Sequence, residues 1–393
     1  MLTTPFTFSL PTRVIFGQPA AEALVSQLKA LAAEHVLLVS DRGLAQAGLP
    51  ERLRAQLAQA GYAVTVFTGV SSNPTTAEVA SGLAIAEELG VQAIAALGGG
   101  SAIDVAKAIA MLLANGGNYA DYQWGNKAIT RPSRPVIAIP TTAGTGSEVS
   151  KVMVIVDPEN PFKKGVLSPL MFAHAAIIDP ELTRSLPPQM TAATGMDAFI
   201  HALEAYIGKR TNPFTDQFAL AAMEIIWQAL PAAVADGDDM PARRQMSLAA
   251  VWGGIAMDQA GLGLVHSLSG PLTAHLHLHH GLANALILPY VMQFNLPAVA
   301  PDRRSRLAGL LGLEAGAGDE LIVSALRRFV QGLGLPTRLC ELDASAADFA
   351  VTALRSGPDW ATIAEETTRM VLIGNNPRAA SAGDCEKILA QMQ

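Results

Sequence analysis

Between residues 36 and 180 the chain alternates short β-branched runs with longer, alanine-rich amphipathic runs. The strand-like runs are VLLVSD, YAVTVFTGV, AIAALGGGS, PVIAIPTT and AAIIDP, and segments such as GLAQAGLPERLRAQLAQAG and TTAEVASGLAIAEELG separate them. Strands that alternate with helix-length segments build successive βαβ units. The pattern therefore predicts a Rossmann-like α/β domain, in which helices cover both faces of a parallel sheet.

The pattern changes after SLPPQMT, where strand-like runs nearly vanish and long helical periods such as FTDQFALAAMEIIWQAL take over. A chain of 393 residues is too long for one compact core. We therefore expect two domains, an α/β nucleotide-binding domain at residues 1–187 and an all-helical domain at residues 188–393.

Charge and cysteine usage narrow the class of protein. The net charge of −7 comes with scattered basic residues, so neither nucleic acid nor a membrane surface is an expected partner. The two cysteines, Cys340 and Cys385, lie far apart, and MLTTPFTFSLPTR lacks the features of a secretory signal. Charges interrupt the longest apolar stretches before a spanning length of about 20 residues. We expect a cytoplasmic protein without a transmembrane helix.

The run LGGGSAIDVAKAIA places Gly98, Gly99, Gly100 and Ser101 between a buried strand and the start of a helix. Backbone amides without side-chain bulk can approach a pyrophosphate there, and the helix N-terminus adds positive potential. The spacing differs from the GxGxxG fingerprint. A glycine-rich turn that serves packing alone stays open as an alternative.

Two further features point to a dinucleotide. Asp41 ends the strand VLLVSD, where a carboxylate can accept hydrogen bonds from a ribose 2′-hydroxyl and repel a 2′-phosphate, which favours NAD over NADP. Asp41 can equally cap the next helix. The loop PTTAGTGSEVS follows another strand and suits a nicotinamide or a phosphate at the carboxyl ends of the strands.

The second half contains candidate metal ligands. Asp197 and His201 are four residues apart in GMDAFIHALEAY, so they project from one face of a helix whose apolar neighbours predict burial. Five of the eight histidines fall within residues 266–280 and can supply further ligands. One carboxylate with three imidazoles suits Fe(II), Zn(II) or a similar ion with a position left for substrate. A fortuitous cluster is the alternative.

Five motifs in this order resemble the iron-dependent (group III) alcohol dehydrogenases: GGGSAIDVAKAIA, PTTAGTGSEVS, GMDAFIHALEAY, AGLGLVH and HGLANA. The resemblance runs from FSLPTRVIFG to NNPR and so covers nearly the whole chain. It implies a dehydroquinate synthase-like fold and a homodimer or higher homo-oligomer. It also implies a divalent ion, usually Fe(II) with Zn(II) as the other option, on Asp197, His201, His266 and His280.

The resemblance further implies NAD as cofactor and a small alcohol or aldehyde as substrate. The implied cofactor contacts are Asp41, Asn73, Gly98, Gly99, Gly100, Ser101, Asp104, Thr141, Thr142, Thr145 and Lys163. The expected enzyme is thus a metal-dependent, NAD-linked alcohol dehydrogenase or aldehyde reductase with its active site between the two domains. A family member that has kept only a binding role, and a non-redox enzyme related to dehydroquinate synthase, are the alternatives.

Three positions depart from the family pattern. Gly270 stands where relatives carry a second histidine that is credited with proton relay, His279 replaces the usual proline, and residues 257–259 read Met, Asp, Gln. The chain therefore needs another route for the proton. We expect His279 to be the catalytic relay, with His275, His277 or a water beside Gly270 as alternatives. All three histidines can also be surface residues.

Overall fold

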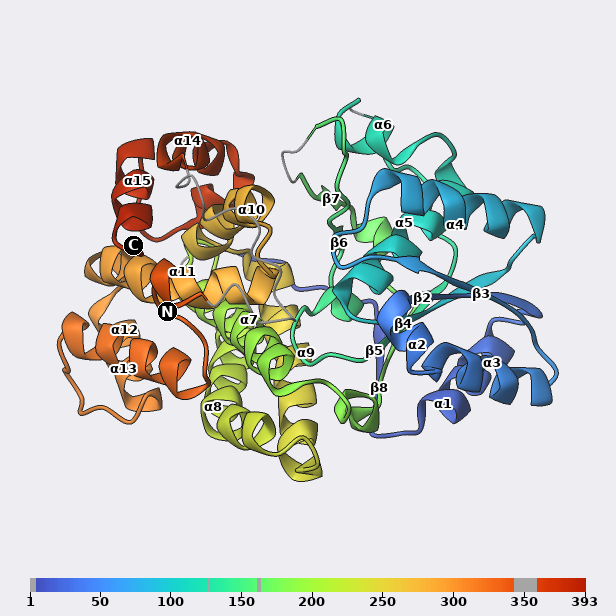
Figure 1. The fold of residues 1–393 in the computed structure, drawn as a ribbon, viewed down its shortest axis with the longest axis horizontal. Helices are drawn as coiled ribbons and strands as arrows, with labels where there is room; N and C mark the ends of the chain where they lie inside the picture. Colours follow the sequence, from blue (N-terminus) through green and yellow to red (C-terminus); the bar gives the residue numbers. More distant parts are fainter. Residues whose placement is uncertain (1–4, 126, 161–163, 343–358) are drawn as a thin grey trace. The chain divides into compact units, whose positions relative to one another are not determined.

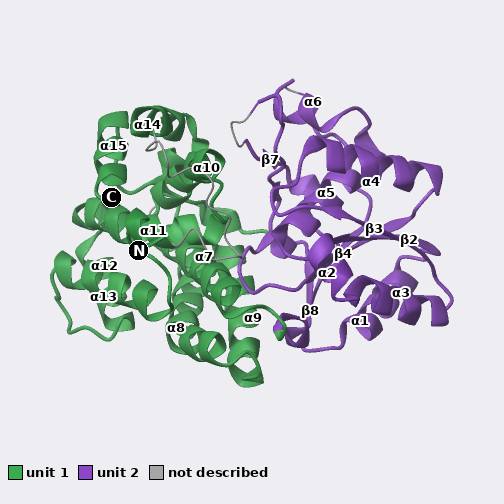
Figure 2. Cartoon of the chain, in the orientation of Figure 1, with its two compact units in different colours: residues 1–9, 184–393 green, residues 10–183 purple. Residues whose placement is uncertain are grey.

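The computed structural model describes residues 5–125, 127–160, 164–342 and 359–393. The chain forms two compact units (Figure 2). One unit is Leu10–Thr183, and the other comprises the residues from Arg184 onward together with the described residues before Leu10. The chain thus divides four residues ahead of the predicted boundary at 187, and its first described residues belong to the helical unit.

The first unit is built on a six-stranded sheet in which all neighbouring strands are parallel (Figure 1). The strand order is β1-β8-β5-β4-β2-β3. The strands are β1 (Arg13–Phe16), β2 (His35–Asp41), β3 (Ala63–Val70), β4 (Ala93–Gly98), β5 (Val136–Pro140) and β8 (Ala175–Ile178). The helices are α1 (Ala20–Ala30), α2 (Arg42–Gln46), α3 (Leu49–Gln59), α4 (Thr76–Glu88), α5 (Gly100–Asn115) and α6 (Tyr119–Gln123).

Successive residues of the central strands enter two separate hydrophobic cores. Leu37 and Val39 of β2 pack into the core that contains α4 and α5. Val36 and Leu38 pack into the core that contains α1 and α3. Side chains alternate between the two faces of a strand, so a continuous apolar run is what a strand buried on both faces requires. The predicted parallel sheet with helices on both faces is confirmed.

Three local features differ from the expectation. The helix expected over 43–61 is broken into α2 and α3 at Ala47 and Gly48, because Gly48 adopts φ 74°, a left-handed conformation. The edge strand β1 was not predicted. The short strands β6 (Val152–Met153) and β7 (Val166–Leu167), which pair antiparallel, were not predicted either.

The described part of the second unit is helical, as expected. Its α-helices are α7 (Pro188–Ile207), α8 (Pro213–Ala235), α9 (Met240–Ala260), α10 (Leu264–Leu276), α11 (His280–Asn295), α12 (Pro301–Leu310), α13 (Asp319–Gly332), α14 (Trp360–Arg369) and α15 (Ala382–Ala390). Ser9 joins this unit, since its backbone N–H and C=O both hydrogen-bond the side chain of Gln259 on α9. α7 is the central helix, buried from Thr191 to Ile207 and packed against α8, α9 and α11.

One described helix is long and apolar enough to cross a membrane. α8 contains an 18-residue window of mean hydropathy 1.6. The same helix packs along α7 and α9, and its buried positions include Ala222, Met223 and Ile226. A core helix of this kind passes the same length and hydropathy test, so α8 is weak support for a membrane span.

Candidate metal centre and nucleotide site

α7 presents three polar side chains on one buried face. Asp197, His201 and Glu204 occupy positions i, i+4 and i+7, so they lie in a row along about two turns of helix. All three residues are less than 5% exposed within a helix that is otherwise mostly apolar. Charged and polar groups buried in this way are costly unless they are paired or bind a ligand.

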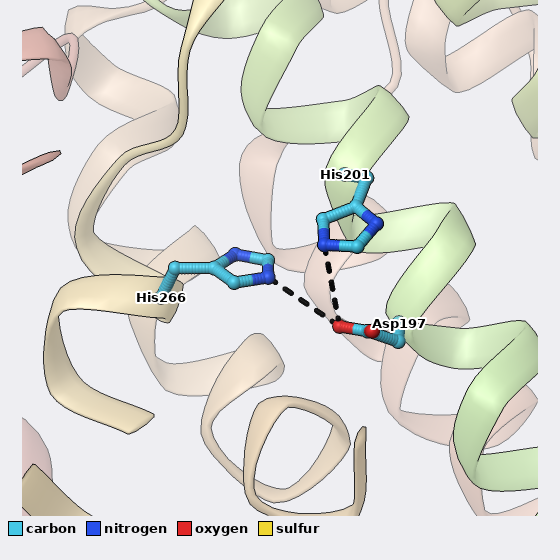
Figure 3. Close-up of side chains that lie close together, drawn as sticks. All are labelled: Asp197, His201 and His266. Atoms are coloured by element: carbon cyan, nitrogen blue, oxygen red, sulfur yellow. Dashed lines mark ion pairs between the residues drawn. The ribbon is translucent and has the colours of Figure 1, made fainter. Parts of the chain in front are cut away.

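Three predicted ligands from two helices meet at the Asp197 carboxylate (Figure 3). His201 Nε2 lies 3.5 Å from Asp197 Oδ1, and His266 Nε2, from the first turn of α10, lies 3.4 Å from the same oxygen. The two imidazole rings stack with their centroids 4.7 Å apart. His280, the first residue of α11, adds its Nε2 at 3.7 Å from Asp197 Oδ1, and its side chain is 45% exposed.

These distances fit a metal ion better than direct hydrogen bonds. An N–H···O hydrogen bond spans about 2.7–3.2 Å. Nitrogen and oxygen ligands about 2.1 Å from one ion lie roughly 3.0–3.5 Å from one another, depending on coordination geometry. The separations of 3.4, 3.5 and 3.7 Å fall at or just above that range, and all three imidazoles face one carboxylate oxygen. The donor set therefore suits a divalent ion.

Glu204 contacts His266 at Nδ1, the ring nitrogen that does not face Asp197. Its Oε2 lies 2.7 Å from His266 Nδ1 and also accepts the backbone N–H of Gly263, while Oε1 accepts the N–H of Val265. With Nδ1–H donated to the carboxylate, the lone pair of the ring lies on Nε2, the nitrogen that faces Asp197. Glu204 thus fixes the tautomer of His266 and caps the N-terminus of α10 with the same side chain.

The pKa values of Asp197 and His266 are shifted by the charged groups around them. Burial alone would raise the pKa of Asp197, but the imidazoles of His201, His280 and His266 hold it well below the usual range of a carboxyl group. Burial alone would lower the pKa of His266, but the carboxylates of Asp197 and Glu204 raise it to about 9. Without an ion the cluster is therefore a carboxylate–imidazolium network. A divalent ion would replace the proton on His266 Nε2.

The predicted cofactor residues of the first unit gather at the carboxyl ends of four neighbouring strands. Asp41 ends β2, Asn73 follows β3, Gly98 ends β4, and Thr141 follows β5. From β2 the chain runs outward to β3, and it then returns to place β4 on the other side of β2. Such a reversal of strand order is where open α/β sheets bind nucleotides.

The glycine run, residues 98–100, packs closely against the threonine loop, residues 141–145. A Cβ on Gly100 would lie 2.9 Å from the Thr145 side chain, and one on Gly99 would lie 3.5 Å from Thr142. The Thr142 hydroxyl is buried and has no hydrogen-bond partner among the described residues. A bare backbone at a helix N-terminus beside an unsatisfied hydroxyl fits an anionic ligand such as a pyrophosphate.

Two further predicted cofactor residues, Asp41 and Ser101, have hydrogen-bond partners within the protein. Asp41 Oδ1 accepts the N–H of Leu44 and caps α2, while its Oδ2 lies 3.2 Å from where a Cβ on Gly98 would stand. One carboxylate can therefore both cap α2 and accept hydrogen bonds from a ribose beside Gly98. Ser101 donates to the carbonyl of Ser72, next to Asn73. Lys163 lies outside the described residues.

Asp104 faces the protein rather than open space. Its Oδ1 accepts the Ser147 hydroxyl and its Oδ2 accepts the Val154 N–H. The fully buried Lys107 donates to the same hydroxyl and to the carbonyls of Ser150 and Val152. Asp104 and Lys107 therefore hold the segment that follows the threonine loop.

The surplus histidines occupy the junction between α10 and α11. His275 lies 3.1 Å from Glu366 and its side chain is 38% exposed. His277 is exposed and adopts φ 53°, while His279 is half-buried and forms the N-cap of α11 directly before His280. One turn after His266, a Cβ on Gly270 would meet the Met370 methyl at 3.3 Å and no other described side chain within 4 Å.

Glu204 and Asn284 were missed by the sequence reasoning. Glu204 stands seven residues after Asp197, and Asn284 stands four residues after His280, so helical periodicity places each on the face of a predicted ligand. That spacing was the available signal. It could not show that Glu204 contacts a histidine 62 positions away or that Asn284 contacts a carboxylate 87 positions away.

Comparison with known proteins agrees with this architecture. Residues 11–180 match the family described as "Iron-containing alcohol dehydrogenase", and residues 191–393 match "Fe-containing alcohol dehydrogenase family, C-terminal". An NAD-dependent methanol dehydrogenase from Bacillus methanolicus is 36% identical over 97% of this chain and 98% of its own. The 1-propanol dehydrogenase PduQ of Salmonella typhimurium is 37% identical over 98% and 99%.

A solved structure of a 1,3-propanediol oxidoreductase superposes with a TM-score of 0.91 at 32% identity, covering 99% of this chain and 100% of that one. The chain is thus an oxidoreductase of the alcohol dehydrogenase class. It belongs to the iron-containing alcohol dehydrogenase family.

Proposed function

We propose that this enzyme interconverts a short primary alcohol and its aldehyde with NAD(H), at a divalent ion held by Asp197, His201, His266 and His280. The observation that carries the proposal is the buried convergence of imidazole nitrogens on Asp197 Oδ1. Fe(II) is the first candidate, because the ligands are hard or borderline donors and the family is described as iron-containing. Zn(II) fits the same donor set.

A nicotinamide bound to the first unit would supply hydride acceptance from the alcohol or hydride donation to the aldehyde. A bound divalent ion supplies Lewis-acid polarisation of the alcohol or carbonyl oxygen. Asp197 and the three histidines would hold the ion, and Glu204 would keep His266 in the tautomer whose Nε2 faces it. The glycine run and the threonine loop would bind the dinucleotide, and Asp41 would favour NAD over NADP.

The substrate proton needs a route, and His279 is the proposed relay. Gly270 has no side chain to move a proton, and Met370 faces it with an apolar methyl group. Of the three additional histidines, His275 pairs with Glu366 and His277 is exposed, whereas His279 is half-buried beside the ligand His280. An unperturbed imidazole titrates near 6.5, which suits proton transfer at neutral pH.

The substrate is proposed only as a class of small alcohols, and the protein as a homo-oligomer of a reducing compartment. The relatives are named for methanol, 1-propanol and 1,3-propanediol, which supports a small alcohol as substrate. A homodimer or higher homo-oligomer is the proposed assembly. Both cysteines are free thiols, which supports a reducing compartment such as the cytoplasm.

The test follows NADH absorbance with a panel of primary alcohols and aldehydes from one to six carbons. Protein freed of metal by chelation is reloaded anaerobically with Fe(II) or with Zn(II). We expect turnover only in the reloaded protein and none in Asp197→Ala. Turnover without metal would contradict the assignment, and a metal-loaded protein that binds NADH but turns over no member of the panel would favour the binding role.

A further inference from the structure

Asn284 places its amide nitrogen inside the cluster of predicted metal ligands. It lies on α11 one turn after His280 and is fully buried. Its Nδ2 is 2.7 Å from Asp197 Oδ1, 3.1 Å from His280 Nε2 and 3.2 Å from His266 Nε2. One side chain therefore contacts the ligand atoms of three residues from three helices.

The nitrogen, rather than the oxygen, of this amide faces the cluster. A carboxylate oxygen only accepts hydrogen bonds, so an amide oxygen 2.7 Å from Asp197 Oδ1 would be repelled. Asn284 Oδ1 is buried and has no hydrogen-bond partner among the described residues. The hydrogen bonds of this amide to the described residues are therefore all made by Nδ2, even though a buried acceptor without a partner is destabilising.

The two hydrogens of the Asn284 amide face different groups. One is donated to Asp197 Oδ1. Among the described residues, the other lies near the imidazole nitrogens of His266 and His280, and these two nitrogens are the ones that a divalent ion would take. Once the ion is held, this buried N–H needs a new acceptor. Under the proposed function, the substrate oxygen would approach the same cluster and would be available to accept this hydrogen bond.

We propose that Asn284 donates a hydrogen bond to the oxygen of the alcohol or aldehyde substrate while its other N–H holds the Asp197 carboxylate in place. The inference rests on the proposed function and adds a substrate contact to it. Asn284 is then a catalytic residue in the sense that it touches the substrate oxygen, where negative charge develops when the alcohol loses its proton.

The test measures binding of trifluoroethanol, an alcohol that resists hydride removal, to the metal-loaded enzyme with NAD⁺ by calorimetry. Asn284→Leu keeps the shape without any polar group, and Asn284→Asp keeps an acceptor without the donor. We expect both to bind trifluoroethanol about two- to tenfold more weakly, the range that the loss of one hydrogen bond produces. Metal content is measured in parallel, and affinities are compared only between samples loaded to the same metal occupancy.

Asn295→Ala is the matched control, because Asn295 is also fully buried on α11 and its amide pairs with Asn376 instead of the metal ligands. It should lower Tm and leave trifluoroethanol affinity unchanged. Wild-type affinity in both Asn284 variants, or in Asn284→Asp alone, would overturn the inference. A wild-type protein that neither binds trifluoroethanol nor oxidises any alcohol would instead contradict the proposed function.

Discussion

At the scale of single residues, the centre depends on side chains that need not touch an ion. Glu204 serves His266, Gly263 and Val265 with two carboxylate oxygens, so the orientation of a ligand and the start of its helix are set together. Asp41 likewise combines a helix cap with a position beside Gly98. In both cases one carboxylate caps a helix and also has a proposed role in metal or cofactor binding. A suitable substitution can remove one of these roles and keep the other.

Glu204→Gln should weaken metal binding about 10- to 100-fold, because an amide cannot accept hydrogen bonds at both ends and the His266 tautomer is no longer fixed. Chelator competition measures the affinity. Glu224→Gln, on an exposed position of α8, is the control and should bind metal like wild type. An unchanged affinity in Glu204→Gln would show that the carboxylate only caps α10.

Asp41→Ser should shift the cofactor preference toward NADPH by tenfold or more, expressed as the ratio of kcat/KM for NADH to that for NADPH. The substitution removes the charge that would repel a 2′-phosphate, while serine still caps α2 and spares the fold. Asp41→Asn is a second neutral variant that also retains the cap. A wild type that prefers NADPH, or a ratio that neither variant moves, would argue against this role.

At the scale of elements, the sequence predicts those strands and helices whose apolar residues follow a regular pattern. β2, β4 and β5 are nearly continuous apolar runs because both of their faces are buried, and they were predicted. β1 is a four-residue edge strand with mostly exposed side chains and one partner, so its sequence carries little signal. The Asp197–His201 pair follows from helix geometry. The contacts of Glu204 and Asn284 depend on which helices pack together, and no local pattern encodes that.

The junction between α10 and α11 tests the proton route. His279→Gln should lower kcat and remove an ionisation from its pH profile at unchanged metal content, whereas His277→Gln, at an exposed position, should leave both unchanged. His275→Gln breaks only the contact with Glu366 and should also retain the profile. If all three variants keep the wild-type profile, solvent is the proton donor and the role proposed for His279 fails.

At the scale of the whole molecule, each unit buries apolar side chains of its own, and the two cysteines of the helical unit differ in exposure. Cys385 on α15 is fully buried, and burial, with a smaller contribution from Asp384, raises the pKa of its thiol to about 11. Cys340 is exposed. Thiolates, rather than thiols, react with disulfide reagents, so access and ionisation both protect Cys385 in the folded enzyme.

A disulfide reagent at pH 8 should therefore label one thiol per chain quickly and the second only when the helical unit opens. Cys340→Ser should abolish the fast phase, and Cys385→Ala the slow one. The slow rate should rise with denaturant in parallel with the loss of helical circular dichroism, because both report the same opening of a buried core. If both thiols of the native enzyme reacted at the fast rate, α15 would be detached from the core in solution, contrary to the complete burial of Cys385.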